Sequence, residues 1–212
     1  MTDPILLLAS TSPSRAKLLR DSGIAFDQLG SEVDEDAVVS EAGLTEPSEI
    51  ALALARAKCE AVAALPQAAE RLVIGCDSVF ELDGQPLGKP YTAAVARERI
   101  GQMRGRTGHL HTGHWLIDTR SPDDGGTGLS EGALAGADVT FAAMTDDEIA
   151  AYVDTEEPLW VAGSFTLDGY GAAFIERVDG DLHAVIGLSV NTLRQLAGRA
   201  GVPVRRLWGR EA

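Results

Sequence analysis

The amino-acid sequence predicts an α/β fold organised as a single domain over residues 1–212. Short apolar runs typical of strands alternate along the chain with segments of helical composition that carry their own capping residues. Neither a repeat nor a long linker interrupts this alternation. With 212 residues, of which 45% are hydrophobic, the chain can form one sizeable core or two small lobes.

The first predicted strand, residues 5–8, leads into a hydroxyl-rich turn and a helix. Ser12 is a good N-cap, Pro13 suits the first helical position and Gly23 ends the helix. The free N–H groups and the positive dipole end of such a helix attract an anion. Arg15 stands in the first turn, where a purely structural helix prefers Asp or Glu. The pattern favours an anion site, and the alternative is a capped helix with a solvated arginine.

A short strand at residues 24–26 precedes an acidic run at residues 31–36, which we expect to be a solvated loop. One carboxylate of this run could bind a metal or position a base if the loop folds over the central segment of the chain. A strong helix follows at residues 47–64, with Ser48 as its cap. On this helix Lys58 borders the apolar face and can reach inward along its long stem.

The centre of the chain combines a short buried strand with an isolated carboxylate. Residues 72–74 are apolar and partly β-branched, and Gly75 ends this pattern just before Asp77. We therefore expect Asp77 at the end of a strand, where open α/β sheets place ligands. The Asp-Gly pair at residues 83–84 favours a tight hairpin that would return Lys89 towards Asp77.

The alternative for this carboxylate and lysine is a surface ion pair, which contributes roughly 0 to 1 kcal/mol. A phosphate loop is excluded for the segment at residues 84–90. Its glycine-to-lysine spacing is one residue too short, and a proline stands where Ser or Thr should bind magnesium.

Residues 92–103 predict a helix, after which a turn leads into a strand at residues 109–118. Three histidines lie close together on this strand. His109 and His111 point to one face and His114 to the other, because side chains alternate along a strand. A three-histidine zinc site is therefore disfavoured.

The C-terminal part of the chain contains two glycine-rich segments. Residues 121–130 are expected to form a mobile hairpin loop. In residues 161–172, the glycines indicate either close approach of the backbone to a ligand or a structural turn. Further strands are predicted at residues 133–142, 174–178 and 182–186, the last two as a hairpin around the Asp-Gly pair at 179–180. Further helices are predicted at residues 145–152, opened by a capping box, and at residues 191–199.

The formal net charge of −14 excludes several classes of partner. Nucleic acid and anionic lipid need a basic face, so we expect neither, and an anionic ligand must be met by a local cluster of Arg and Lys. Cys59 and Cys76 have no metal-ligand spacing and make no disulfide framework, so we expect reduced thiols. No apolar run approaches the roughly 20 residues of a membrane span, and Met1 to Pro4 has no basic region, so we expect a cytoplasmic protein.

Four motifs, in order, resemble those of the Maf family of nucleotide pyrophosphatases, and the similarity runs over nearly the whole chain. They are Leu-Ala-Ser-Thr-Ser-Pro-Ser-Arg at 8–15, Ala-Arg-Ala-Lys at 55–58, Gly-Cys-Asp-Ser-Val at 75–79 with Gly-Lys-Pro at 88–90, and Ala-Gly-Ser-Phe at 162–165 with Asp-Gly at 168–169. Each motif alone is weak, but the four together and in order are specific.

The resemblance implies a Maf/inosine-triphosphatase-like fold, in which a mixed twisted sheet and flanking helices form two lobes around a deep cleft. It also implies a homodimer that hydrolyses nucleoside triphosphates to the monophosphate and pyrophosphate with a divalent metal, Mg²⁺ or else Mn²⁺ or Co²⁺. The catalytic residues that it implies are Asp77, Lys89, Lys58 and Arg15, and the metal ligands are Asp77 and Glu35. The residues expected to bind substrate are Ser10, Ser12 and Asp168, together with Arg56 as a further candidate.

The chain departs from the family pattern at two positions. Ser14 stands where the family usually has a first arginine, so Arg15 handles the phosphates alone or with Arg56. Asp168 stands where subgroups carry Gln or Glu, which leaves the preferred base open among dTTP, UTP, CTP and modified guanine nucleotides. Two other functions remain as alternatives: a non-catalytic nucleotide-binding regulator of septum formation, and a phosphatase with Asp77 as nucleophile. The phosphatase is disfavoured because no second acid follows two residues later.

Overall fold

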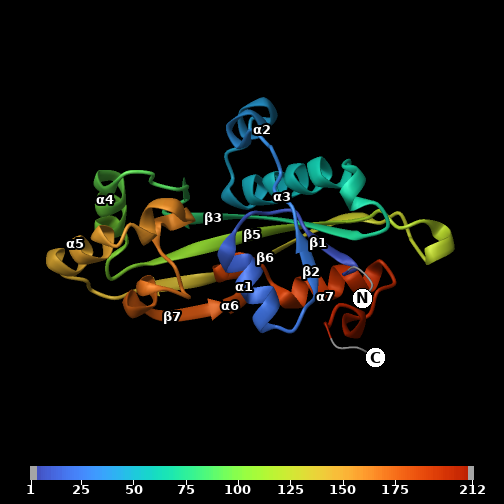
Figure 1. The fold of residues 1–212 in the computed structure, drawn as a ribbon. Coiled ribbons are helices and arrows are strands. Elements are labelled where there is room, and N and C mark those ends of the chain that lie inside the picture. Colours follow the sequence, from blue (N-terminus) through green and yellow to red (C-terminus); the bar gives the residue numbers. More distant parts are fainter. Residues whose placement is uncertain (1–3, 210–212) are drawn as a thin grey trace.

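A mixed sheet runs the length of the protein and carries helices on its faces (Figure 1). The computed structural model describes residues 4–209, and within them the sheet has seven strands in the order β2-β1-β3-β5-β6-β7, with β4 paired to β3. The strands are β1 (Leu6–Leu8), β2 (Phe26–Gln28), β3 (Leu72–Leu82), β4 (Gln85–Leu87), β5 (Thr107–Asp118), β6 (Ser130–Phe141) and β7 (Ile175–Gly180). The predicted α/β class is confirmed.

Seven α-helices and several short 3-10 turns complete the described residues. The helices are α1 (Pro13–Asp21), α2 (Glu35–Ala42), α3 (Pro47–Ala63), α4 (Ala93–Met103), α5 (Asp146–Asp154), α6 (Leu182–Ile186) and α7 (Val190–Arg199). The 3-10 turns are η1 (Pro66–Ala68), η2 (Pro122–Asp124), η3 (Glu157–Trp160), η4 (Ala162–Ser164), η5 (Tyr170–Phe174) and η6 (Val204–Arg206). None of these helices is long and apolar enough to cross a membrane.

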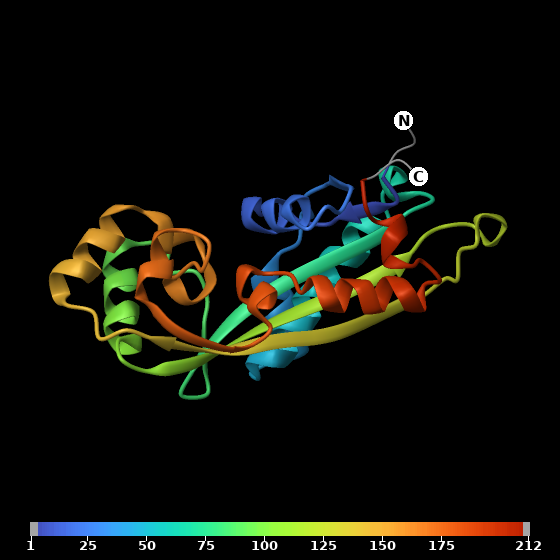
Figure 2. The ribbon, with the colours of Figure 1, turned by 90° about the horizontal axis from the view of Figure 1, so that it is seen from below.

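The long strands β3, β5 and β6 connect two lobes (Figure 2). In one lobe, side chains of β1, β3, α1 and α7 form a core that includes Leu8, Ile74 and Leu196. In the other, helices α4 and α5 cover a core around Phe80 and Phe141. Helix α3 lies along the sheet, and α2, which has no buried residue, stands away from it (Figure 1).

One edge of β3 is interrupted between the two lobes. Strand β5 pairs with β3 on one side from Leu72 to Glu81. On the other side, β1 pairs only with residues 72–74 and β4 only with residues 80–82. Within the described chain, residues 75–79 therefore have no strand partner on that side. We call this stretch the edge gap.

Strand β3 corrects the expectation that Gly75 ends a short strand, because it continues to Leu82. Gly75 has a different function: a Cβ there would overlap the carbonyl oxygen of Ala55 and lie 2.7 Å from the Cβ of Cys59. The glycine thus lets α3 pack closely on the sheet. As a result, Asp77 lies in the middle of a strand and not at its end.

Three further expectations need correction. Residues 182–186, predicted as a strand, form α6, because the side chain of Asp181 accepts a hydrogen bond from the N–H of Ala184 and caps a helix. The acidic run is not wholly a loop, since Asp34 caps α2 and Glu35 begins it. Helix α3 begins at Pro47, so that Ser48 lies inside its first turn.

Other expectations are confirmed. The Asp83-Gly84 pair forms the β3–β4 turn with positive φ at both residues, and Thr145 opens α5 with a capping box. The loop at residues 121–130 connects β5 to β6 and contains η2. The single domain of residues 1–212 stays a prediction, and the expected N-terminal segment falls partly on residues 1–3, which lie outside the described residues.

Candidate active site

A cleft of about 430 Å³ opens at the edge gap between the two lobes. All but one of the residues predicted for the site line this cleft. They are Ser10, Ser12, Arg15, Glu35, Lys58, Asp77, Lys89 and Asp168. Residues that are far apart in the sequence therefore form one continuous surface.

The edge gap explains why these residues meet. Strand β1 ends at one side of the gap, so the turn that carries Ser10 and the start of α1 enters the cleft there. Strand β4 ends at the other side, and Lys89 follows it two residues later. Asp77 occupies the gap itself, and α3, packed beside Gly75, presents Lys58 to it.

Lys58 joins two carboxylates. Its Nζ lies 2.5 Å from Oδ1 of Asp77 and 2.7 Å from Oε1 of Glu35. The side chains of Lys58 and Asp77 are each only 12% exposed, so this contact is largely shielded from water. The three groups therefore form a charged cluster in the floor of the cleft.

The two carboxyl groups of this cluster respond differently to their surroundings. Burial raises the pKa of Asp77, and the positive charges of Lys58 and Arg15 only partly offset that effect. Burial also acts to raise the pKa of Glu35, but the hydrogen bond and charge of Lys58, with the charges of Lys89 and Arg15, outweigh it and lower this pKa. Asp77 is thus the more basic of the two carboxylates.

Arg15 is fixed by hydrogen bonds from three elements. Its Nε donates to the carbonyl oxygen of Gly187 at 2.7 Å, Nη1 to Oγ of Ser10 at 3.2 Å and Nη2 to Oγ of Ser78 at 3.4 Å. Ser78 in turn lies 2.9 Å from Oγ1 of Thr112, measured between the two hydroxyl oxygens. This network holds the guanidinium at the wall of the cleft, where it can contact an anion.

The N-terminus of α1 forms part of the same wall. Ser12 caps the helix by accepting the N–H of Arg15 at 3.4 Å, and the N–H of Ser12 donates to Oγ of Ser10 at 3.2 Å. The backbone before the helix is also held by Gln28, whose Nε2 donates to the carbonyl oxygen of Ser10 at 2.6 Å. The positive end of the helix dipole therefore adds to the charge of Arg15.

The opposite lobe supplies Asp168 from a loop that is fixed by Glu157. The carboxylate of Glu157 accepts hydrogen bonds from the hydroxyls of Tyr152 (3.0 Å) and Thr166 (2.6 Å). It also accepts the N–H groups of residues 170 and 171, each at 2.9 Å. The glycine-rich segment is thus an ordered turn around a half-buried carboxylate.

Arg56 is the one predicted site residue that the structure does not bring to the cleft. Its Nε donates to Oε1 of Glu60 at 2.7 Å, and its guanidinium lies 4.9 Å from the ring centre of Trp115. The side chain is 56% exposed. Arg56 therefore does not line the cleft that contains Arg15.

The cysteines and histidines have no direct part in this site. Cys59 and Cys76 are buried free thiols, and burial raises the pKa of each to about 12, which leaves them un-ionised at neutral pH. His109 and His111 contact each other on one face of β5, whereas His114 is buried on the other face, as the alternation predicted. No cluster of three or more metal-binding side chains was found among residues 4–209.

Reasoning from the sequence missed the groups that hold Arg15 and Asp168 in place, namely Ser78, Thr112, Gly187 and Glu157. Of these four residues, only Ser78 has a position in the sequence that could have indicated its role. It is the neighbour of Asp77 on a strand, so its side chain must point to the opposite face of the sheet and towards the helices there.

The carboxylates of Asp77 and Glu35 fit a divalent metal. Both converge on a single ammonium group, so both can reach a cation at that position. Mg²⁺ is commonly held by one or two carboxylates together with substrate phosphates and water, which agrees with a pair of ligands in place of a complete protein cage.

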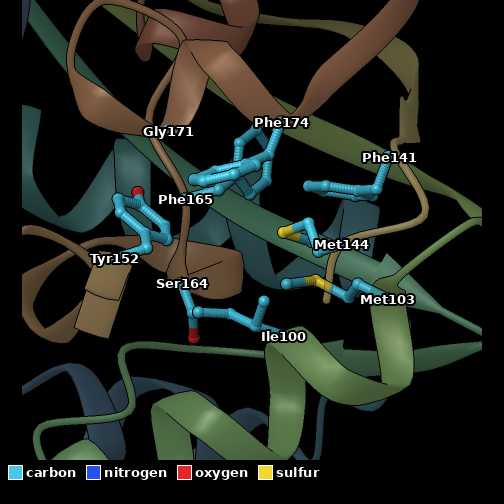
Figure 3. Close-up of a pocket in the computed structure, with 9 residues that line it drawn as sticks. All are labelled: Ile100, Met103, Phe141, Met144, Tyr152, Ser164, Phe165, Gly171 and Phe174. Atoms are coloured by element: carbon cyan, nitrogen blue, oxygen red, sulfur yellow. The ribbon is translucent and has the colours of Figure 1, made fainter. Parts of the chain in front are cut away.

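A second cavity lies inside the lobe of α4 and α5 (Figure 3). Its volume of about 10 Å³ is roughly that of one water molecule, which excludes a nucleotide. Its lining is mostly apolar and consists of Ile100, Met103, Phe141, Met144, Tyr152, Ser164, Phe165, Gly171 and Phe174. The large cleft is therefore the candidate active site.

Comparison with known proteins identifies relatives over nearly the whole chain. The family model described as "Maf-like protein" matches residues 5–200. A Streptomyces coelicolor protein named nucleoside triphosphate pyrophosphatase is 52% identical over 203 residues, which are 96% of this chain and 94% of the relative. Proteins of the same name from Leifsonia xyli subsp. xyli and Mycobacterium sp. (strain JLS) are 47% and 45% identical, and each alignment covers at least 97% of both chains.

Among solved structures, the Staphylococcus aureus Ham1 protein aligns with 96% of this chain and 93% of its own chain. The TM-score is 0.36 and the sequence identity is 14%. This likeness is too low to support an inference.

Proposed function

The chain belongs to the Maf-like protein family, and from this premise we propose that it is a nucleoside triphosphate pyrophosphatase. The reaction splits a nucleoside triphosphate between its α and β phosphorus atoms, giving the monophosphate and pyrophosphate. One observation carries the proposal: in a protein of net charge −14, Arg15, Lys58 and Lys89 line the same cleft as Asp77.

The cations of the cleft suit a triphosphate. Arg15 offers a guanidinium whose planar fork matches phosphate oxygens, and it is already oriented by its hydrogen bonds. The start of α1 adds N–H groups, and Lys58 and Lys89 add compact charges. The two lysines would stabilise the negative charge that develops on the pyrophosphate leaving group.

Asp77 is the residue that we assign to the attacking water. Its raised pKa makes it a better proton acceptor than an exposed aspartate, and it would take the proton of that water on its carboxylate. A divalent metal held by Asp77 and Glu35 would supply the charge that lowers the pKa of a water molecule and shields the phosphates. Lys58 contacts both carboxylates and so keeps them together before substrate arrives.

The fold does not determine which base the protein prefers. Pyrimidine or modified nucleotides are the expected substrates. Asp168 and Thr166 line the cleft on the lobe of α5 and offer polar groups that could read the edge of a base. We also expect the protein to act in the cytoplasm as a homodimer, as the family resemblance implies. Light scattering in solution tests the dimer.

The proposal is tested by incubating the pure protein with Mg²⁺ and a panel of nucleoside triphosphates while pyrophosphate and orthophosphate are assayed separately. We expect pyrophosphate, and Asp77→Asn should abolish its release. The matched control is Asp83→Asn, which changes an exposed aspartate paired with Arg106 outside the cleft. Chelation of the metal with EDTA should stop the reaction, and Mg²⁺, Mn²⁺ or Co²⁺ should restore it.

Binding without turnover, with any nucleotide and metal, would refute the pyrophosphatase and support the nucleotide-binding regulator. Release of orthophosphate would instead support a phosphatase.

A further inference from the structure

Two large aromatic side chains stand exposed at the mouth of the cleft. Trp160 lines the cleft and yet is 62% exposed, so it lies between the interior of the cleft and solvent. Tyr91 is 58% exposed, and its ring meets the ring of Trp160 edge to face at 6.1 Å between centroids. Exposed Tyr and Trp rings that lie together beside a cleft are typical of surfaces that bind a ligand or a partner.

The backbone fixes this pair. The N–H of Tyr91 donates to the carbonyl oxygen of Leu159 at 3.0 Å, which ties the loop after β4 to η3. Tyr91 itself adopts a positive φ of 59°, a conformation that is unfavourable for a residue other than glycine. Strained backbone of this kind persists where the surroundings hold it and is concentrated at functional sites.

The pair is connected through the backbone to a cation of the cleft. Lys89 is two residues before Tyr91 on the same loop and lines the cleft. Trp160 is joined to that loop through the neighbouring Leu159. In a nucleotide, one ribose separates the base from the phosphates, so a surface for the base must lie close to the phosphate-binding cations.

We infer that Trp160, held edge-on by Tyr91, is the stacking platform for the base of the nucleotide. This inference rests on the proposed function and adds the base-binding part of the same cleft. Stacking uses the π-face that all bases share, so Trp160 would contribute affinity for every base, and discrimination among bases would fall to polar groups such as Asp168.

The test compares a ligand that has a base with one that has none. The first is a uridine triphosphate analogue with a methylene group between the α and β phosphorus atoms, which is not hydrolysed, and the second is inorganic tripolyphosphate. Trp160→Leu should weaken binding of the analogue about 5- to 100-fold and change tripolyphosphate binding less than about twofold. Trp160→Phe, which keeps an aromatic face, should restore most of the affinity.

The matched control is Trp208→Leu, which removes an exposed tryptophan (47%) that does not line the cleft. It should leave both ligands unaffected. The intrinsic fluorescence gives a second readout, since the analogue should change the emission of the wild type and of Trp208→Leu but not of Trp160→Phe.

Equal weakening of both ligands by Trp160→Leu, or no weakening of either, would overturn the inference. So would unchanged affinity together with a smaller oligomer, because the pair would then serve self-association. The assay is independent of turnover: a protein that releases no pyrophosphate refutes the proposed function, while the two binding constants still decide the role of Trp160.

Discussion

The Nε of Arg15 donates a 2.7 Å hydrogen bond to the carbonyl oxygen of Gly187, which joins the first helix of the chain to the end of α6. Gly187 has a φ of 121°, and a Cβ at this position would lie 3.1 Å from that same Nε. The glycine therefore allows both the turn and the close approach of the arginine. One wall of the cleft depends on this contact between the two ends of the fold.

Arg15→Lys keeps the positive charge but cannot make the three hydrogen bonds to Gly187, Ser10 and Ser78 at once. Hydrogen bonds to charged groups contribute about 1.5 to 3 kcal/mol each, so we expect kcat/KM for pyrophosphate release to fall about 10- to 100-fold. Arg56→Lys, on the exposed side of α3, is the control and should retain wild-type kinetics. Equal effects of the two substitutions would contradict the geometry described for Arg15.

Glu157→Gln should loosen the loop that carries Asp168. The amide replaces one oxygen that accepts hydrogen bonds by an NH₂ group, which faces donors and leaves some of them unsatisfied. We expect a loss of about 1 to 3 kcal/mol in the free energy of unfolding, measured by urea denaturation, and a higher KM. The exposed neighbour Glu156, changed to Gln, should alter neither quantity.

His114 makes stability depend on pH. Burial, followed by the charge of Arg15, lowers its pKa to about 4, and its Nε2 accepts the N–H of Ser189 at 2.7 Å. In the unfolded chain the pKa is about 6.5, so below that pH the unfolded state binds a proton that the folded state excludes. The contribution of neutral His114 to the free energy of unfolding is complete above about pH 6.5 and decreases as the pH falls towards 4.

This histidine should account for a loss of about 2 kcal/mol at pH 5 relative to neutral pH. His114→Gln, whose side-chain oxygen can still accept the N–H of Ser189, should remove that part of the slope in urea titrations between pH 7 and 5. Parallel slopes for the variant and the wild type would show that His114 does not carry the effect.

Two glycines near the site should differ sharply when changed to alanine. Gly75→Ala places a Cβ against the carbonyl of Ala55 and against Cys59, so we expect a loss of about 1 to 3 kcal/mol or more in the free energy of unfolding. A Cβ at Gly88 meets nothing within 4 Å, and the φ of Gly88 is not in the left-handed region. Gly88→Ala should therefore keep its wild-type melting temperature, and a comparable loss in both variants would contradict this packing.

The sequence predicted most elements because their signals are local. Ser12 and Thr145 cap helices through side chains within three residues, and the Asp83-Gly84 pair sets its own turn. Two of the failures, at α2 and α6, had local signals that were not recognised, namely the caps Asp34 and Asp181. The failure at Gly75 has a non-local cause. Gly75 was expected to end a strand, but its absent side chain accommodates a helix that begins 28 residues earlier, at Pro47.

The residues of the candidate site likewise fall into those that the sequence predicted and those that it did not. Asp77 and Lys89 were predicted from a hairpin that returns one towards the other, Lys58 from its place beside the apolar face of a helix, and Glu35 from the family resemblance alone. The partners of Arg15 could not be found, since Gly187 lies 172 residues away and contributes only a backbone carbonyl. Arg56 lies in the same motif as Lys58, but its side chain contacts Glu60 and Trp115 and does not line the cleft.

The edge gap has a consequence for how the protein avoids aggregation. A strand with unpaired N–H and C=O groups invites a strand of another molecule to add to the sheet. At residues 75–79 this edge is short, lies at the floor of a cleft and is flanked by the charges of Arg15, Lys58 and Glu35. Pairing with another strand would remove water from these charged side chains, which costs free energy. The residues that we assign to triphosphate binding thus also prevent the open edge of the sheet from pairing with a strand of another molecule.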